Sequence, residues 1–433
     1  MFRSFSRFFN NLGLSANVGF FLATRSIRRS SKWTTSLIIF IMVLTFLNLV
    51  VVSGLLVGLI QGSFQQFQEK YSGEILITPA PGREYIEGSP RIVEYLKAHR
   101  DVQSISPRYS KLASILGTLS DNPRVGEKPN QAGGAIIGLD PELEEKVTGF
   151  SSNILVGTNL SKGDEGYILV GSNLIKKYSS FADIDIPGLE LLKDVEVGNR
   201  VRVTLTGDSA TPVSKDFVVK GIVKSKVDQV STRFFVLDTE LRRMLQTNEY
   251  ELNEISIRTD QDRAKQLSEE FKTFINNSRV RVQTTEEALP SFLRQVELTF
   301  NILGNALSSI ALVVATITVF IVVFINAVTR RKFIGIMKGI GISPGAIKMS
   351  YVFQSIFYGV CGSVIGLVLT FGFLKPYFDA NPIDFPFSDG ILVATPEGSV
   401  IRVAILILVT ILAGYIPSRM IVRKNTLDSI LGR

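Results

Sequence analysis

Four long runs of apolar residues set the strongest limit on what this chain of 433 residues can fold into. They cover residues 33–60, 298–328, 350–374 and 403–422, and the first three contain no charged residue. An α-helix needs about 20 apolar residues to cross the hydrocarbon core of a bilayer, and each run reaches that length. The sequence therefore predicts four transmembrane helices.

Basic residues are concentrated beside three ends of these predicted helices. The segments 1–32, 329–349 and 417–433 carry clusters of Lys and Arg, in a chain whose formal net charge is +8. Because Lys and Arg flank the cytoplasmic ends of transmembrane helices, we expect these segments, and hence both termini, on the cytoplasmic side of the cytoplasmic (inner) membrane. Residues 61–297 and 375–402 then lie outside. This topology accounts for the basic charge, so no binding to nucleic acid is expected.

The segment between the first two apolar runs is long enough to bury a core of its own. Strict alternation at 200–206 and 216–223, around the polar stretch 207–215, predicts a β-hairpin. Apolar spacing at 261–276 predicts an amphipathic helix, and the mixture predicts an α+β domain with two lobes divided near residues 145–165. Further elements are expected as strands at 74–78, 102–105, 233–237, 254–258 and 279–283, and as a helix capped by Ser89-Pro90.

The expected fold class is thus an α-helical membrane protein with four transmembrane helices and a large extracytoplasmic α+β domain. This class divides the chain into nine segments. In order they are a basic, amphipathic cytoplasmic segment (1–32), the first transmembrane helix (33–60), the extracytoplasmic domain (61–297), the second helix (298–328), a cytoplasmic segment (329–349), the third helix (350–374), an extracytoplasmic loop (375–402), the fourth helix (403–422) and a cytoplasmic tail (423–433).

The sequence shows no recognisable catalytic pattern. Its single histidine, His99, and single cysteine, Cys361, exclude a zinc site built from clustered His and Cys and an intrachain disulfide bond. A nucleotide-binding P-loop needs a Gly-Lys pair, and that dipeptide does not occur in the chain. No ionisable residue lies deep in a predicted membrane helix, which argues against a transporter driven by protons or sodium ions. We therefore expect no enzyme activity, metal or cofactor in this chain.

Pairs of glycines at a spacing of four occur in two of the predicted membrane helices. Such pairs let helix backbones approach each other closely. The residues predicted to pack helix against helix are Gly54, Gly58, Gly362 and Gly366.

Residues 329–345 (TRRKFIGIMKGIGISPG) resemble the signature of the FtsX/MacB-type permeases of ABC transporters. Residues 22–36 and 417–433 resemble that family's basic stretch before the first membrane helix and its C-terminal tail. The order of one helix, a large external domain and three further helices is also the same. The external segments 166–178, 197–205 and 217–245 are most similar to the lipoprotein-releasing LolC/LolE branch.

This resemblance implies a MacB-like periplasmic core and a cytoplasmic coupling helix that contacts an ABC ATPase dimer. ATP and Mg would be bound by that separate dimer, and a second permease copy or a paralogue would complete the transporter. The chain departs from the family pattern at Phe333, where the family has Glu. The ATPase-coupling residues that the resemblance implies are Arg331, Lys332, Phe333, Gly335, Met337, Lys338, Gly339, Gly341 and Ser343.

The resemblance also implies a mechanical permease that releases a lipoprotein or another amphipathic substrate from the outer leaflet of the membrane. Candidate contacts with a lipidated substrate, for which helix–helix packing is an equal alternative, are Leu55, Leu59, Phe64, Phe67, Phe292, Leu293 and Phe300. Membrane lipid is a further expected partner of the chain. The hairpin turn stands where one subunit of that branch has a hook that recruits a periplasmic carrier, which makes Gly207, Pro212 and Lys215 the candidate carrier loop. Two alternatives stay open: an exporter of an antibiotic, peptide, haem or glycolipid, and a signalling permease that activates a cell-wall hydrolase.

Overall fold

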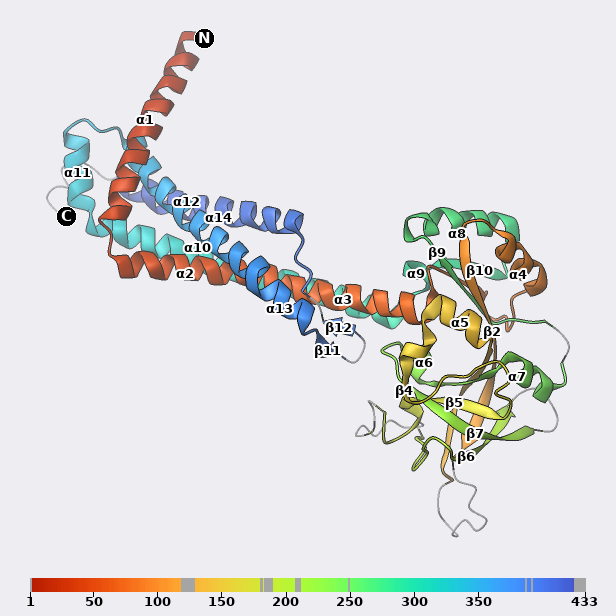
Figure 1. Ribbon diagram of the computed structural model, residues 1–433. Helices are drawn as coiled ribbons and strands as arrows, with labels where there is room; N and C mark the ends of the chain where they lie inside the picture. The colour runs from red at the N-terminus through yellow and green to blue at the C-terminus, as the bar shows by residue number, and fades with distance from the viewer. Residues whose placement is uncertain are drawn as a thin grey trace. The chain divides into compact units, whose positions relative to one another are not determined.

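The computed structural model describes residues 2–117, 129–179, 182, 190–206, 212–247, 250–385, 388–390 and 392–423. The chain divides into two compact units (Figure 1). The helical unit comprises Met1–Leu59, Gln295–Ile383 and Gly390–Arg433. The α/β unit comprises Ile60–Arg294 and Asp384–Asp389.

Within the described residues, four helices are long and apolar enough to cross a bilayer, as the apolar runs predicted. They cover Lys32–Ser72, Ser291–Thr329, Pro344–Ala380 and Pro396–Met420. The first continues past residue 60 as an α-helix to Phe67 and ends in the π-helical turn Gln68–Ser72. The helices and turns of this part of the chain are α1 (Phe2–Arg28), α2 (Lys32–Leu47), η1 (Asn48–Val52), α3 (Ser53–Phe67), η2 (Gln68–Ser72), α10 (Ser291–Thr329), α11 (Arg331–Gly339), α12 (Pro344–Leu369), η5 (Thr370–Leu374), α13 (Lys375–Ala380) and α14 (Pro396–Val422).

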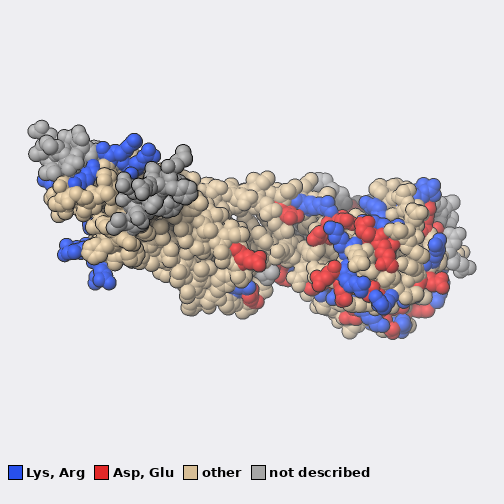
Figure 2. Space-filling view, turned by 90° about the horizontal axis from the view of Figure 1, so that it is seen from above, with Lys and Arg blue, Asp and Glu red and all other residues tan. Residues whose placement is uncertain are grey.

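Helix α12 is the centre of the helical unit, where it packs against α1, α2 and α14. Its buried face includes small residues such as Gly359, Gly362 and Gly366, which admit neighbouring helices closely. The outer faces of the unit are apolar, as lipid-facing surfaces are, whereas Lys and Arg gather at one end (Figure 2). That end is called the basic end below.

The α/β unit contains a ten-stranded sheet in the order β10-β1-β9-β2-β3-β8-β5-β7-β4, with β6 paired to β2 and β7. The strand bounds are β1 (Ile75–Pro79), β2 (Val102–Leu116), β3 (Gln131–Leu139), β4 (Ile154–Gly157), β5 (Tyr167–Gly171), β6 (Arg200–Thr206), β7 (Val213–Val223), β8 (Arg233–Leu237), β9 (Glu254–Thr259) and β10 (Val280–Thr284). The helices and short turns are α4 (Ser89–Ala98), α5 (Pro141–Thr148), η3 (Phe150–Asn153), η4 (Ser172–Leu174), α6 (Asp228–Ser231), α7 (Asp238–Leu245), α8 (Gln261–Ile275) and α9 (Thr285–Ala288), while β11 (Ile383–Phe385) and β12 (Ser388–Gly390) form a separate pair.

Strand β2 is shared by two parts of this sheet. Its first half pairs with β9, and its second half pairs with β3 and β6. One core gathers around Ile77, Ile257 and Phe271, and a second around Val203 and Phe234. The predicted α+β class is confirmed, but a division near residues 145–165 is wrong, because β9 and β10 return to the first core late in the chain.

Two local predictions also need correction. Helix α4 is capped by Gly88 in a left-handed conformation (φ 74°), and Ser89 and Pro90 form its first turn. The hairpin of β6 and β7 is antiparallel as predicted, but β7 begins at Val213, so Lys215 lies in a strand and not in the turn.

Candidate functional site

The predicted coupling segment forms helix α11 and the turn that follows it. Gly341, at φ +95°, reverses the chain in a conformation that favours glycine. The Ser343 side chain then caps α12 by accepting a hydrogen bond from the Ala346 N–H (3.2 Å), and Pro344 occupies the first helical turn. The turn thus fixes where α11 ends and α12 begins.

The two faces of α11 differ in burial. Ile334 is buried in the core of the helical unit, and Met337 packs against that core. Phe333, Ile336 and Ile340 are 67%, 50% and 73% exposed. Residues at this spacing lie on one face of a helix, so α11 and its C-cap residue Ile340 present an exposed apolar stripe beside the basic residues of α11.

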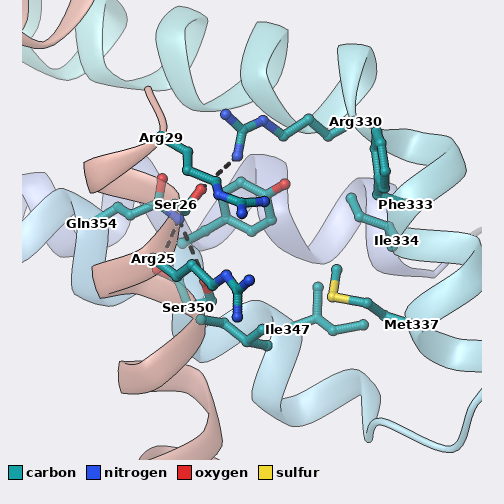
Figure 3. Close-up of a pocket in the computed structure, with 12 residues that line it drawn as sticks. Arg25, Ser26, Arg29, Arg330, Phe333, Ile334, Met337, Ile347, Ser350 and Gln354 are labelled. Carbon is teal, nitrogen blue, oxygen red and sulfur yellow. Dashed lines mark hydrogen bonds between the residues drawn. The ribbon is translucent and has the colours of Figure 1, made fainter. Parts of the chain in front are cut away.

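A pocket of about 390 Å³ lies between α1, α11 and α12 (Figure 3). It is lined by Leu22, Arg25, Ser26, Arg29, Arg330, Phe333, Ile334, Met337, Ile347, Ser350, Tyr351 and Gln354. Arg25 of α1 and Arg29, the residue after the end of α1, extend toward α11, while Arg330 extends from the start of α11 toward α1. The Arg330 Nη1 group donates a hydrogen bond to the Ser26 hydroxyl (2.7 Å), which ties the two helices together.

The structure places the predicted coupling residues at this basic end. Phe333 and Met337 line the pocket, and Gly335 is buried against the bundle. Sequence reasoning missed Arg25, Ser26 and Arg29 as partners of this segment. Together with Leu22 they have the three- and four-residue spacing of one helix face. Only the packing of α1 on α12 shows which residues this face contacts.

Two of the four predicted packing glycines lie at close contacts with another helix. A Cβ atom on Gly362 would overlap Met42, and one on Gly366 would overlap the Phe46 ring. A Cβ on Gly54 would stand 2.8 Å from the Val393 carbonyl oxygen, and Gly58 is buried.

The residues predicted to contact substrate do not share one environment. Leu59 and Phe67 are buried, and Phe67 packs in a core with Tyr71, so burial removes both from the predicted contact surface. Phe292 is exposed. Leu55, Phe64, Leu293 and Phe300 are partly exposed.

The predicted carrier loop is only partly described. Gly207 lies outside the described residues, and Pro212 is exposed. The Lys215 Nζ group donates to the buried Glu240 carboxylate (2.6 Å), which ties β7 to α7.

A buried ionic network in the α/β unit was not predicted from the sequence. Arg108 on β2 donates to both carboxylate oxygens of Glu144 on α5, at 2.7 and 2.9 Å. Arg108 also contacts Glu254 on β9 (3.3 Å), which accepts hydrogen bonds from Arg233 (3.0 and 3.2 Å) and from the Tyr71 hydroxyl (2.8 Å). These residues are far apart in the chain, so no local pattern signals their meeting.

This network keeps its carboxylates charged. Burial by itself would raise the pKa of Glu254, but the charges of Arg233 and Arg108 outweigh it and lower the pKa to about 2. Burial also acts to raise the pKa of Glu144. The charge of Arg108 and the hydrogen bonds from Arg108, Ser106 and Thr148 outweigh burial, so this pKa lies below its usual range. A network whose members are all paired can stabilise one arrangement of strands and helices.

Comparison with known proteins relates the C-terminal part of the chain to a family of permeases. Residues 305–426 match the family "FtsX-like permease C-terminal", so the region that contains α11, α12 and α14 is similar to an FtsX-like permease domain. An uncharacterised ABC transporter permease of Methanocaldococcus jannaschii, MJ1507, is 25% identical over 248 residues. The ABC transporter permease YtrF of Bacillus subtilis is 26% identical over 136 residues.

These similarities cover parts of the proteins compared. The match to MJ1507 spans 55% of this chain and 59% of that relative, and the match to YtrF spans 28% and 30%. Among solved structures, the periplasmic region of MacB from Actinobacillus actinomycetemcomitans aligns with a TM-score of 0.34 and 14% identity, over 53% of this chain and 95% of that one. The extracellular domain of the noncanonic ABC-type transporter YknZ from Gram-positive bacteria aligns with a TM-score of 0.31 and 14% identity, over 48% and 99%.

Proposed function

We propose that this chain is the permease subunit of an ABC transporter of the cytoplasmic (inner) membrane, and that α11 docks onto a separate ATPase. The observation that carries the proposal is the exposed apolar stripe of Phe333, Ile336 and Ile340. A helix with an apolar face is commonly recognised by a groove in a partner protein, which covers that face. The matches to an FtsX-like permease domain and to ABC transporter permeases support an ATPase as that partner.

The basic charge around α11 supports a cytoplasmic position for the docking helix. Arg331, Lys332 and Lys338 lie on α11, Arg25 lies on α1, and Arg29 follows the end of α1. Positive residues mark the cytoplasmic side of membrane helices, which is where ATP is available. ATP and Mg would be bound by the partner dimer, and a second permease subunit would complete the transporter.

We further propose that the permease acts mechanically on an amphipathic substrate, with a lipoprotein as the favoured example. Exposed apolar side chains on α10, where this helix begins, support that class. Phe292, Leu298 and Ile302 are each at least 60% exposed and offer apolar surface to lipid or to an acyl chain. A periplasmic carrier would receive the substrate if the hairpin turn of β6 and β7 serves as a hook.

The docking surface can be tested by co-purification from native membranes in mild detergent, with mass spectrometry of the bound proteins. The double variant Phe333→Ala/Ile336→Ala should co-purify with at least tenfold less ATPase than the wild type, while it still inserts into the membrane and stays monodisperse. Trp33→Ala is the matched control, because Trp33 is an exposed apolar residue on α2 that does not belong to the stripe. Normal ATPase recovery with the double variant would overturn the assignment of α11.

The bound cargo separates the substrate classes in the same experiment. Lipidated proteins recovered with the ATPase support release of an amphipathic substrate. A soluble cell-wall hydrolase recovered without lipidated cargo would contradict that class and favour a signalling permease.

A further inference from the structure

The pocket between α1, α11 and α12 carries a concentrated positive charge. Three of its lining residues, Arg25, Arg29 and Arg330, are cationic, and none of the described lining residues is acidic. The chain has no Asp or Glu in residues 1–68 or 298–378, which supply all three helices. These segments therefore contain no carboxylate that could balance the guanidinium groups.

Only one of these arginines has a hydrogen-bonding partner among the described side chains that line the pocket. Arg330 donates to Ser26, whereas Arg25 and Arg29 extend toward α11 without a lining acceptor (Figure 3). A guanidinium group offers several N–H donors in a planar fork that matches the oxygens of a phosphate. The arrangement of the arginines thus fits a phosphate group better than a neutral ligand.

Five of the nine other lining residues are apolar, and the remaining four are Ser26, Ser350, Tyr351 and Gln354. Leu22, Phe333, Ile334, Met337 and Ile347 face the same cavity as the arginines. Inorganic phosphate needs no apolar wall and far less than 390 Å³. An anion that carries a hydrocarbon chain would use both kinds of wall, since acyl carbon buried against these side chains leaves water.

The pocket also lies at the level where a membrane surface is expected. Trp33, at the start of α2, is 88% exposed, and exposed tryptophan is typical of the membrane interface. Basic pockets between membrane helices on the cytoplasmic side are suited to anionic lipid headgroups. A zwitterionic headgroup would bring its own positive charge toward three guanidinium groups, which disfavours it.

We propose that this pocket binds one anionic phospholipid, with its phosphate held by Arg25, Arg29 and Arg330 and the start of its acyl chain against Phe333 and Met337. The lipid would link α1 to α11 and so set the position of the docking helix. The proposal concerns the pocket alone and does not require an ATPase partner.

Lipid retention by the full-length protein tests this site. Native mass spectrometry from detergent micelles would use phosphatidylglycerol, phosphatidylcholine and inorganic phosphate as separate probes. The wild-type chain should retain one phosphatidylglycerol, with an affinity at least tenfold above that for phosphatidylcholine. Arg25→Gln/Arg29→Gln should weaken phosphatidylglycerol retention at least tenfold, and phosphatidylglycerol should raise the melting temperature of the wild type but not of this variant.

A matched pair of substitutions separates a specific site from general charge attraction. Arg28→Gln/Lys32→Gln removes the same charge from the same end of the chain, but neither residue lines the pocket. This control should retain phosphatidylglycerol as the wild type does. Equal weakening of phosphatidylglycerol retention in both double variants would overturn the proposed lipid site. Stabilisation by inorganic phosphate equal to that by lipid would also overturn it, because the pocket would then be a site for free anions.

Discussion

Arg108 and Glu144 form a buried, two-pronged ion pair that joins strand β2 to helix α5, with Nη2–Oε1 and Nε–Oε2 distances of 2.7 and 2.9 Å. Arg108 also donates to the backbone carbonyl of Tyr71 (2.8 Å), at the end of the helix that continues the first apolar run. Together with its contact to Glu254 on β9, this guanidinium group joins β2 to α5, β9 and the turn η2. Its loss would leave the Glu144 charge buried and unpaired.

Replacing Arg108 by methionine should destabilise the α/β unit by about 3–5 kcal/mol, because an unpaired buried charge costs much more than a lost surface contact. Amide hydrogen exchange would detect this loss of stability as faster exchange in peptides from β2 and α5. Arg202→Met is the control, since Arg202 and Asp216 form an exposed pair on the hairpin of β6 and β7, and its stability should change little. Equal protection in wild type and Arg108→Met would show that the network contributes nothing to folding.

Acid should weaken the same unit. The folded-state pKa of Glu254 is lowered to about 2, whereas an unfolded Glu titrates near about 4.3. A lowered pKa contributes stability that is present above the unfolded value and lost as the pH falls through the folded one. Hydrogen exchange, corrected for intrinsic rates, should therefore show stability falling between about pH 5 and pH 2. Glu254→Gln should be less stable than the wild type at neutral pH and should show a shallower acid dependence.

Close helix packing predicts a cost for the smallest possible additions to α12. Gly362→Ala and Gly366→Ala should each destabilise the helical unit by about 1–3 kcal/mol, because the added Cβ meets Met42 or Phe46. Gly372→Ala is the control, since a Cβ there would have no heavy atom within 4 Å. The thermal unfolding temperature, measured in detergent, should fall by several degrees for Gly362→Ala and Gly366→Ala only. An equal fall in the unfolding temperature of Gly372→Ala would indicate that replacing any glycine in this region is destabilising, whether or not its Cβ meets a neighbour.

Length and periodicity predicted the membrane helices and most strands, because those signals depend on neighbouring residues. Strand β2 was expected only over 102–105, yet it continues through Pro107 to Leu116. Pro107 pairs with β9, while the pairing of β2 with β3 begins only at Tyr109. The proline therefore lies where the second edge of the strand has no partner strand, a position that tolerates a missing N–H.

The candidate site shows the same limit. The coupling segment could be located by its basic and apolar residues, and its similarity to a family signature gave its expected partner. The pocket could not be predicted, because its arginines come from helices about 300 residues apart in the chain, as the separation of 304 between Ser26 and Arg330 shows. Which faces of α1 and α12 meet is decided by packing over their whole length, and that information is not contained in any local stretch.

The segment between the third and fourth membrane helices was expected to be a loop, but residues Asp384–Asp389 belong to the α/β unit. Lys226, just after β7, donates to Asp384 (2.7 Å), to the Ser388 carbonyl (3.1 Å) and to Asp389. Gln66 also donates to Asp389 (3.1 Å). Lys226 therefore donates three of the hydrogen bonds that hold the described residues of this segment.

Replacing Lys226 by methionine should release the segment while leaving the core of the α/β unit folded, because the lysine contacts its surface and not the sheet interior. Peptides that span residues 383–390 should then exchange hydrogen at least tenfold faster, with little change in β7 or β8. Lys224→Met provides the control, since Lys224 is exposed and lies two residues away on the same strand end. If Lys226→Met leaves exchange in 383–390 at the wild-type rate, the segment is held by contacts other than this lysine.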